Sequence, residues 1–221
     1  MTWLVNNWSE MIELTIDHLL LALPAILISI LVSIPIARFA FRHPKLGNPI
    51  LVAASLMYAV PGLPLLILIP VLFGLPLRSE ATMIAALSIY GIALLVRTTH
   101  DAFAAVDTTV RDAAIASGHS RRSLFWKVEF PLSVPILLSG IRVMSVSTIS
   151  LVTIGALIGV SSLGTLLTDG FQRGIAAEVG FGVLSTIALA LILDGALLAL
   201  GKALTPWNQQ TTRFRLETAR R

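Results

Sequence analysis

The sequence predicts an all-α, polytopic membrane protein with about five transmembrane helices. Apolar side chains make up 56% of the 221 residues and charged ones only 13%, and the mean hydropathy is +0.87. Soluble domains average about 45–50% apolar and about 25% charged residues. Disorder requires low hydrophobicity and high net charge, whereas the formal net charge here is only +4. We therefore expect residues 1–221 to form a single domain in a lipid bilayer.

Five apolar runs, separated by polar clusters, are candidate membrane spans. About 20 mostly apolar residues cross a hydrocarbon core of about 30 Å. The third run is the shortest, so it must borrow a turn from Arg97–His100 or thin the bilayer locally. In chain order the runs are Leu19–Ala37, Ile50–Phe73, Ala81–Val96, Leu132–Val160 and Val179–Leu200.

The second run contains three prolines and one glycine in its middle. Such a sequence would break a soluble helix, but neighbouring helices in a membrane satisfy the freed backbone groups. We expect a kink that packs against protein. These residues either shape packing alone or border a solute path, as broken helices do in several transporter classes. Our candidate residues for a path or gate are Tyr58, Pro61, Pro64, Gly159 and Gly164.

The positions of the basic residues predict the orientation. Of the 16 Lys and Arg, 13 lie after the first, third and last runs, and the other three are Arg78, Arg142 and Arg173. The positive-inside rule then places the N-terminus outside and the C-terminus inside. This distribution explains the pI near 10.1 without a nucleic-acid partner. The acidic N-terminal stretch lacks the basic residues of a cleavable signal peptide, so we expect it to be retained.

Residues 98–130 form the longest polar stretch between spans, on the side expected to be cytoplasmic. Thr109 and Asp112 fit a capping box, which predicts a helix that starts near the residue after Thr109. Gly118 stands where that helix would end in a left-handed residue, and Ser120 offers an N-cap for a second helix. The segment is therefore expected to form two short helices joined by a sharp turn.

The same segment resembles the EAA loop of binding-protein-dependent ABC importer permeases, whose pattern is E-A-A-x3-G-x9-I-x-L-P. The spacing matches throughout, with Asp for Glu, Val for Ile and Phe130 for Leu. The resemblance implies a type I ABC importer permease-like fold in which residues 98–130 couple the chain to an ATPase. From local chemistry alone, Asp112 and Gly118 are only the cap and stop of a surface turn. The residues implied in coupling are Asp112, Ala113, Ala114, Gly118, Val128 and Pro131.

Four further stretches are similar to the osmoprotectant branch of that family, whose members carry glycine betaine, carnitine or choline. They are Ala59–Pro64, Tyr90–Thr98, Gly140–Arg142 and Ile158–Gly164. The chain departs from the branch where Ser161-Ser162 replaces Gly-Gly and Thr98-Thr99-His100 replaces Asn-Thr-Tyr. The resemblance implies a quaternary amine as substrate. The alternatives are a permease for an amino acid or its derivative, and a membrane scaffold without transport activity.

The resemblance also implies partners and a location. These are an ABC ATPase dimer that binds ATP and Mg, a second permease subunit, an extracytoplasmic solute-binding protein and membrane lipid, in the prokaryotic cell membrane. The chain itself lacks a P-loop, since Gly201-Lys202 is followed by Ala203, and its four His are scattered. We therefore expect no enzymatic activity, no catalytic residue, no metal site and no cofactor in this chain.

Arg142 and Asp194 are the formal charges inside the predicted spans. A charge there costs about 2.5–3.5 kcal/mol on insertion scales, so each needs a partner or water. Their depths nearly coincide, which predicts an ion pair, the alternative being separate hydration. Gly155 and Gly159 form a small-xxx-small pair that favours close helix packing. We expect Ser161–Gly174 to form either a short helix at the outer mouth or an exposed loop.

Overall fold

Helices make up the secondary structure of the part of the chain that the structure describes, in agreement with the predicted all-α class. The computed structural model describes residues 2–206, with side chains from residue 7 onward. The described part contains no strand. The elements are α1 (Thr2–Arg42), α2 (Pro44–Ala59), α3 (Gly62–Phe73), α4 (Glu80–Ala104), α5 (Thr108–Ala116), α6 (Arg121–Leu124), the π-helical η1 (Phe125–Glu129), α7 (Phe130–Ile154), the 3-10 helix η2 (Gly155–Ile158), α8 (Leu163–Arg173) and α9 (Ala176–Leu204).

Within residues 2–206, four helical segments are long and apolar enough to cross a membrane, and α2 with α3 forms a bent pair that gives a fifth if the two helices make one span. The expected number of about five is therefore met when the bent pair is one span. The third predicted run lies in α4, whose 25 residues include Arg97–His100. The helix thus borrows the extra turn and has no need of a thinned bilayer. The four segments are Asn7–Arg42, Glu80–Ala104, Arg121–Ile158 and Ala176–Leu204.

The second predicted run is broken rather than kinked. α2 ends at Ala59, α3 begins at Gly62, and the two axes differ by 115°. Val60 has extended backbone angles (φ −70°, ψ 127°), and so does Pro61 (φ −58°, ψ 143°). A proline disfavours helical geometry in the residue before it, which accounts for the break at this point. The run therefore contributes two short helices at an angle instead of one rod.

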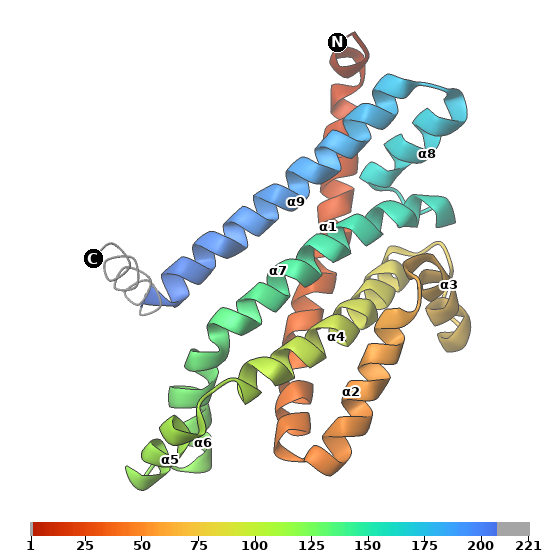
Figure 1. The fold of residues 1–221 in the computed structure, drawn as a ribbon. Helices are drawn as coiled ribbons and strands as arrows, with labels where there is room; N and C mark the ends of the chain where they lie inside the picture. The colour runs from red at the N-terminus through yellow and green to blue at the C-terminus, as the bar shows by residue number, and fades with distance from the viewer. Residues whose placement is uncertain (1, 207–221) are drawn as a thin grey trace.

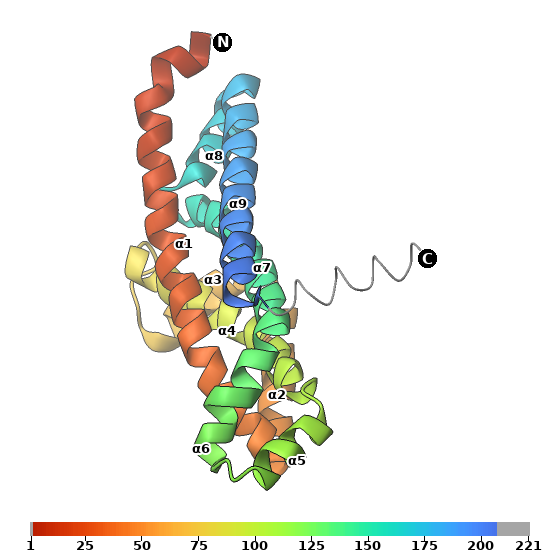
Figure 2. The same cartoon turned by 90° about the vertical axis from the view of Figure 1, so that its left-hand side faces the viewer.

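α1, α4 and α7 pack against one another and hold the core of the molecule. Figure 1 shows α9 on one side of α7, and α2 with α3 on the opposite side, against α4. Figure 2 shows that α5 and α6 lie at the end of the molecule remote from the N-terminus and from α8. Side chains of the three central helices are fully buried in this core: Leu21, Ala22 and Ala25 of α1; Met83, Leu87 and Leu95 of α4; Met144, Ile149 and Val152 of α7.

Small and hydroxyl side chains allow the central helices to approach closely. A Cβ at Gly91 of α4 would collide with the hydroxyl of Ser29 on α1. That hydroxyl donates to the Ala25 carbonyl at 2.7 Å, so it is satisfied inside the core. Packing of small residues, rather than apolar burial, drives helix association in lipid. α9 packs less closely than the central helices, because only 6% of its most apolar stretch is buried inside the molecule.

Candidate coupling and solute-path sites

The segment between α4 and α7 forms a compact unit, residues 108–129, which we call the α5–α6 unit. Its first helix begins at Thr108 because the carboxylate of Asp107 accepts hydrogen bonds from Thr109 N and Thr109 Oγ1, both at 2.8 Å. The predicted capping box of Thr109 with Asp112 is therefore wrong. Two cap-forming residues stand two positions apart, and the earlier one starts the helix. The backbone N–H and hydroxyl of Thr109 lower the pKa of Asp107, and the charge of Arg111 adds to this effect.

The turn after α5 has the geometry expected from the sequence. Gly118 has φ +85°, in the left-handed region where only glycine is free of strain. The amides of Gly118 and His119 donate to the carbonyls of Ile115 at 2.9 Å and Ala114 at 3.1 Å, which is the Schellman arrangement. Ser120 then caps α6 by accepting from Ser123 N at 3.3 Å. The first short helix and the sharp turn are therefore present, whereas α6 continues through η1 into α7 instead of forming a separate short helix.

An ion pair fastens α5 to the start of the long α7 segment. Arg111 Nε lies 3.2 Å from Glu129 Oε1, and the two side chains are only 15% and 10% exposed. Arg111 also donates to the carbonyl of Phe103 at the end of α4. Its guanidinium carbon lies 5.0 Å from the centre of the Phe41 ring. Arg111 therefore ties α5 to α1, α4 and η1 at once.

Sequence reasoning missed Arg111 and Glu129. Eighteen positions separate them, so no local spacing connects them. The available signal was the place of Glu129 between two motif positions, Val128 and Phe130.

Aromatic side chains complete the attachment of the α5–α6 unit. Phe125 of η1 meets the rings of Phe103, Trp126 and Phe130 at centroid distances of 5.7, 5.0 and 5.8 Å. The guanidinium carbon of Arg38 on α1 lies 3.3 Å from the centre of the same Phe125 ring. Cation–π contacts are attractive within about 6 Å of a ring centre. The unit is thus attached to the central helices by packing as well as charge.

The motif residues divide into an outer and an inner set. Asp112, Ala113 and Gly118 are exposed, whereas Ala114 is buried and Val128 and Pro131 are half-buried. The outer set offers a surface of small side chains and one carboxylate. The inner set connects this surface to α7, because Arg121–Ile158 is one helical segment.

The candidate path residues do not gather at one place. The Tyr58 ring at the end of α2 lies 5.7 Å from that of Tyr90 on α4. Pro61 and Pro64 follow at the break, where both are exposed. A Cβ at Gly164 would collide with the carbonyl oxygen of Thr153, so Gly164 allows α8 to lie against the backbone of α7. Close packing explains Gly164 without contact with a solute.

Gly155 and Gly159 do not form the small-residue pair on one helix that their spacing indicates. α7 ends at Ile154, and Gly155 begins η2, where a Cβ would come within 2.9 Å of Met83 Cε. Gly159 has φ +85° and ends η2. Two small residues four positions apart can indicate either helix packing or the end of a helix. Here Gly159 marks the end of the helix η2.

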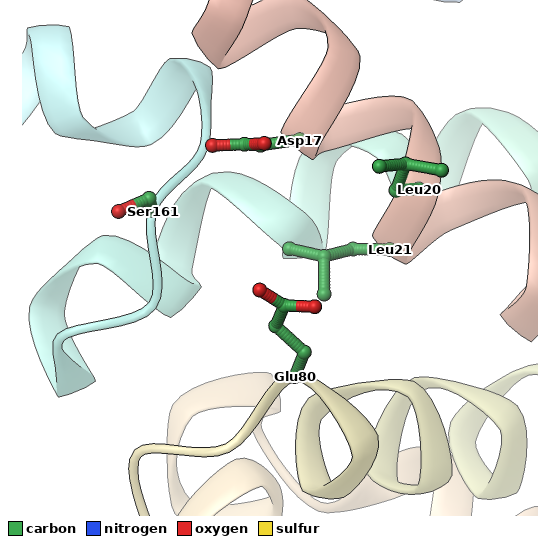
Figure 3. A pocket seen from close by; sticks show the side chains of 5 residues that line it. All are labelled: Asp17, Leu20, Leu21, Glu80 and Ser161. Carbon is green, nitrogen blue, oxygen red and sulfur yellow. The ribbon is translucent and has the colours of Figure 1, made fainter.

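Of the two expectations for Ser161–Gly174, the short helix is the one found, as α8 at the same end of the molecule as the N-terminus (Figure 2). The Ser162 hydroxyl accepts from Gly164 N at 3.1 Å, and Thr165 Oγ1 accepts from Ser162 N at 3.2 Å, so a capping box starts α8. Beside it, Asp17 of α1 and Glu80 of α4 point into a pocket next to Ser161 (Figure 3). The pocket has a volume of about 20 Å³, enough for a single water.

Arg142 and Asp194 meet between α7 and α9. Arg142 Nε donates to Asp194 Oδ1 at 2.7 Å, and Arg142 Nη2 donates to Oδ2 at 2.6 Å, which is a bidentate pair. The two side chains are 32% and 26% exposed, because they line an open cavity of about 480 Å³. We call this cavity the α7–α9 groove. Its lining includes Ser139, Arg142, Val143, Ser147, Leu191 and Asp194.

These features define a class of protein: a multi-pass helical membrane subunit with a compact helical unit at one end. The family model described as "Binding-protein-dependent transport system inner membrane component" matches residues 25–207, and the chain belongs to this family. It is therefore a non-catalytic transmembrane permease subunit of an ABC importer, located in the inner membrane of bacteria.

Two named relatives match almost the whole chain. The osmoprotectant import permease protein OsmW of Salmonella typhimurium is 30% identical over 210 residues, which cover 92% of this chain and 96% of the relative. The carnitine transport permease protein OpuCB of Listeria monocytogenes is 28% identical over 207 residues, 93% of each chain. Among solved structures, the inward-facing methionine ABC transporter MetNI has a TM-score of 0.78 at 16% identity and covers 88% of this chain and 96% of its own. The last similarity concerns the fold.

Proposed function

We propose that the chain is the permease subunit of an ATP-driven importer for a small osmoprotectant, a quaternary amine such as glycine betaine, carnitine or choline. The observation that carries this proposal is the similarity, over more than nine-tenths of both chains, to an osmoprotectant permease and a carnitine permease. The likeness to the methionine transporter supports a shared fold rather than an amino acid as cargo, because the identity is only 16%.

The α5–α6 unit is the proposed contact with the ATPase. Its exposed outer set, Asp112, Ala113 and Gly118, seats in the ATPase surface, where ATP and Mg are bound by that partner and not by this chain. Closure of the ATPase dimer then moves α5, and the Arg111–Glu129 pair and the Phe125 contacts pass the movement to α7. Such rigid-body displacement of packed helices is a common form of conformational switching.

The proposed assembly contains two permease subunits, because about five spans enclose a solute path poorly. The second subunit is another copy or a similar permease, and it covers part of the α9 surface that this chain leaves unburied. An extracytoplasmic solute-binding protein delivers the solute to the end that carries α8. The N-terminus then lies outside and the α5–α6 unit inside.

The coupling role is tested with Gly118→Leu and a matched control, Gly174→Leu. Both glycines have positive φ, +85° and +68°, and open space around a Cβ, so the two variants carry similar backbone strain. We expect Gly118→Leu to insert in the membrane yet to lose co-purifying ATPase and at least nine-tenths of uptake. Gly174→Leu at the end of α8 should keep the ATPase. An unchanged ATPase yield with Gly118→Leu would rule out this docking surface.

The substrate class is tested by competition for uptake of labelled glycine betaine into cells. Carnitine and choline in excess should compete, and methionine and histidine should not. Uptake that only an amino acid inhibits would replace the osmoprotectant with an amino acid as cargo.

A further inference from the structure

The α7–α9 groove has an unusual combination of charge and exposure for a membrane span. Arg142 and Asp194 form a bidentate pair, yet about a third and a quarter of these side chains remain exposed in the groove. A structural ion pair inside a membrane is normally enclosed, because exposed charge in hydrocarbon is costly. The exposed sides of this pair therefore meet water, protein or a polar solute.

The pair has unused hydrogen-bonding capacity on the groove side. A guanidinium has five N–H donors, and Arg142 uses two of them on Asp194. The remaining donors have no acceptor among the described residues. The Asp194 carboxylate likewise accepts two of about four hydrogen bonds that its oxygens can take. An anionic group can therefore bind Arg142, and a cationic group can lie beside Asp194, without breaking the pair.

The rest of the lining fits a small solute with apolar parts. The groove volume of about 480 Å³ falls in the range of about 300–1,000 Å³ that is typical of small-molecule sites. Val143, Val146 and Leu191 offer apolar contact, and two lining serines lie on α7 to either side of Arg142, Ser139 three residues before it and Ser147 five residues after it. This mixture suits methyl groups next to a charged centre.

The charge balance selects the class of solute. Arg142 and Asp194 are the charged residues of the lining, and their charges cancel. A pure cation or a pure anion would leave one uncompensated charge in the membrane, which is unfavourable. A solute whose own positive and negative charges cancel adds no uncompensated charge.

We propose that the α7–α9 groove binds a zwitterionic solute, with its carboxylate on Arg142 and its cationic group beside Asp194. The proposal rests on the proposed function and narrows it, because glycine betaine and carnitine carry both charges whereas choline carries only one. The groove is then part of the solute path. This path does not require the bend at Pro61 and Pro64.

The test uses the absence of cysteine from the chain. Ser139→Cys and Ser147→Cys each place a single thiol in the groove, and Ser150→Cys places one on an exposed part of the same helix outside it. The permease is purified with its ATPase, and its modification by a methanethiosulfonate reagent is followed by mass spectrometry. Glycine betaine, choline and acetate are added at equal concentration and ionic strength.

We expect glycine betaine to slow modification of Ser139→Cys and Ser147→Cys at least fivefold and to leave Ser150→Cys unchanged. Choline and acetate, alone or together, should protect far less. Equal rates with and without glycine betaine, equal protection by choline, or groove thiols that never react would each overturn the proposal. In the last case another subunit or lipid covers the groove.

A charge exchange separates solute binding from a structural role. Arg142→Asp combined with Asp194→Arg keeps an ion pair between α7 and α9 but reverses its direction relative to the serines. We expect the exchanged variant to assemble and to lose protection by glycine betaine, whereas full protection would mean that the pair only holds the helices together. Uptake by the unmodified permease is measured in parallel. Absent uptake of glycine betaine contradicts the proposed function, and normal uptake without protection contradicts the groove alone.

Discussion

Asp107 sets the start of the α5–α6 unit through two hydrogen bonds to one residue. Its carboxylate accepts from the backbone and the hydroxyl of Thr109, and both bonds favour the ionised form. The pKa of Asp107 therefore lies below its ordinary value. By linkage, the carboxylate stabilises α5 above the ordinary pKa, and this contribution is lost as the pH falls through the lowered pKa of the folded state.

Asp107→Asn should separate capping from charge. Asparagine still caps a helix but does not titrate, so we expect wild-type α5 to lose more amide protection than the variant as the pH falls from about 5 to about 2. Hydrogen exchange of peptides covering Thr108–Ala116, corrected for the intrinsic rate at each pH, measures this. An identical loss in both proteins would show that Asp107 does not control α5.

The Arg111–Glu129 pair makes a second prediction at the residue scale. Removing one partner of a largely buried pair leaves an uncompensated charge, which costs about 3–5 kcal/mol. Arg111→Ala and Glu129→Ala should each weaken ATPase association and lower the thermal stability of the α5–α6 unit. The double variant should be less harmful than the sum, with a coupling energy of about 0.5–3 kcal/mol. Strict additivity in this cycle would contradict the pairing.

At the scale of the elements, the position of α8 depends on one close contact with the backbone of α7. A Cβ at Gly164 would collide with the backbone of Thr153, and backbone cannot move aside as a side chain can. Gly180 of α9, by contrast, has nothing within 4 Å of an added Cβ. The two glycines therefore have opposite requirements although both lie in helices.

Alanine substitution at the two positions should have opposite effects. Gly164→Ala forces α8 away from α7 and should cost at least about 1 kcal/mol of stability, in the range of overpacked sites. Gly180→Ala should be neutral or stabilising, by up to about 1 kcal/mol, because alanine favours a helix over glycine. Thermal unfolding of the purified variants measures both. A tolerated Gly164→Ala would show that α8 is not held against Thr153.

For the whole molecule, the arrangement of spans was largely predictable from sequence, because apolar length and charge clusters depend on the membrane rather than on details of packing. The turn at Gly118 was also predictable, since positive φ calls for glycine locally. The 115° break was expected only as a kink, because Pro61 fixes where a helix stops but neighbouring helices fix the angle. The Arg111–Glu129 and Phe103–Phe125 contacts are long-range and have no local signature.

The orientation is a prediction that the cysteine-free chain makes simple to test. Two single-cysteine variants serve as probes, Trp8→Cys and Arg122→Cys. Trp8 lies near the N-terminus and its side chain is 64% exposed, and Arg122 lies on the exposed surface of α6. In intact cells a membrane-impermeant thiol reagent should modify Trp8→Cys at once and Arg122→Cys only after permeabilisation. The reverse pattern would invert the proposed topology. The basic residues at positions 213, 215, 220 and 221, which also support this orientation, lie outside the described residues.

The continuous helical segment Arg121–Ile158 has a mechanical consequence. Its 38 residues include the π-helical η1, and no loop interrupts them. At about 1.5 Å per residue the segment is a lever roughly 57 Å long. Turned by about 10° about its midpoint, such a lever displaces each tip by about 5 Å in opposite directions. A displacement of a few ångströms at α6 would thus move the other end of the segment, beside α8, by a similar distance in the opposite direction.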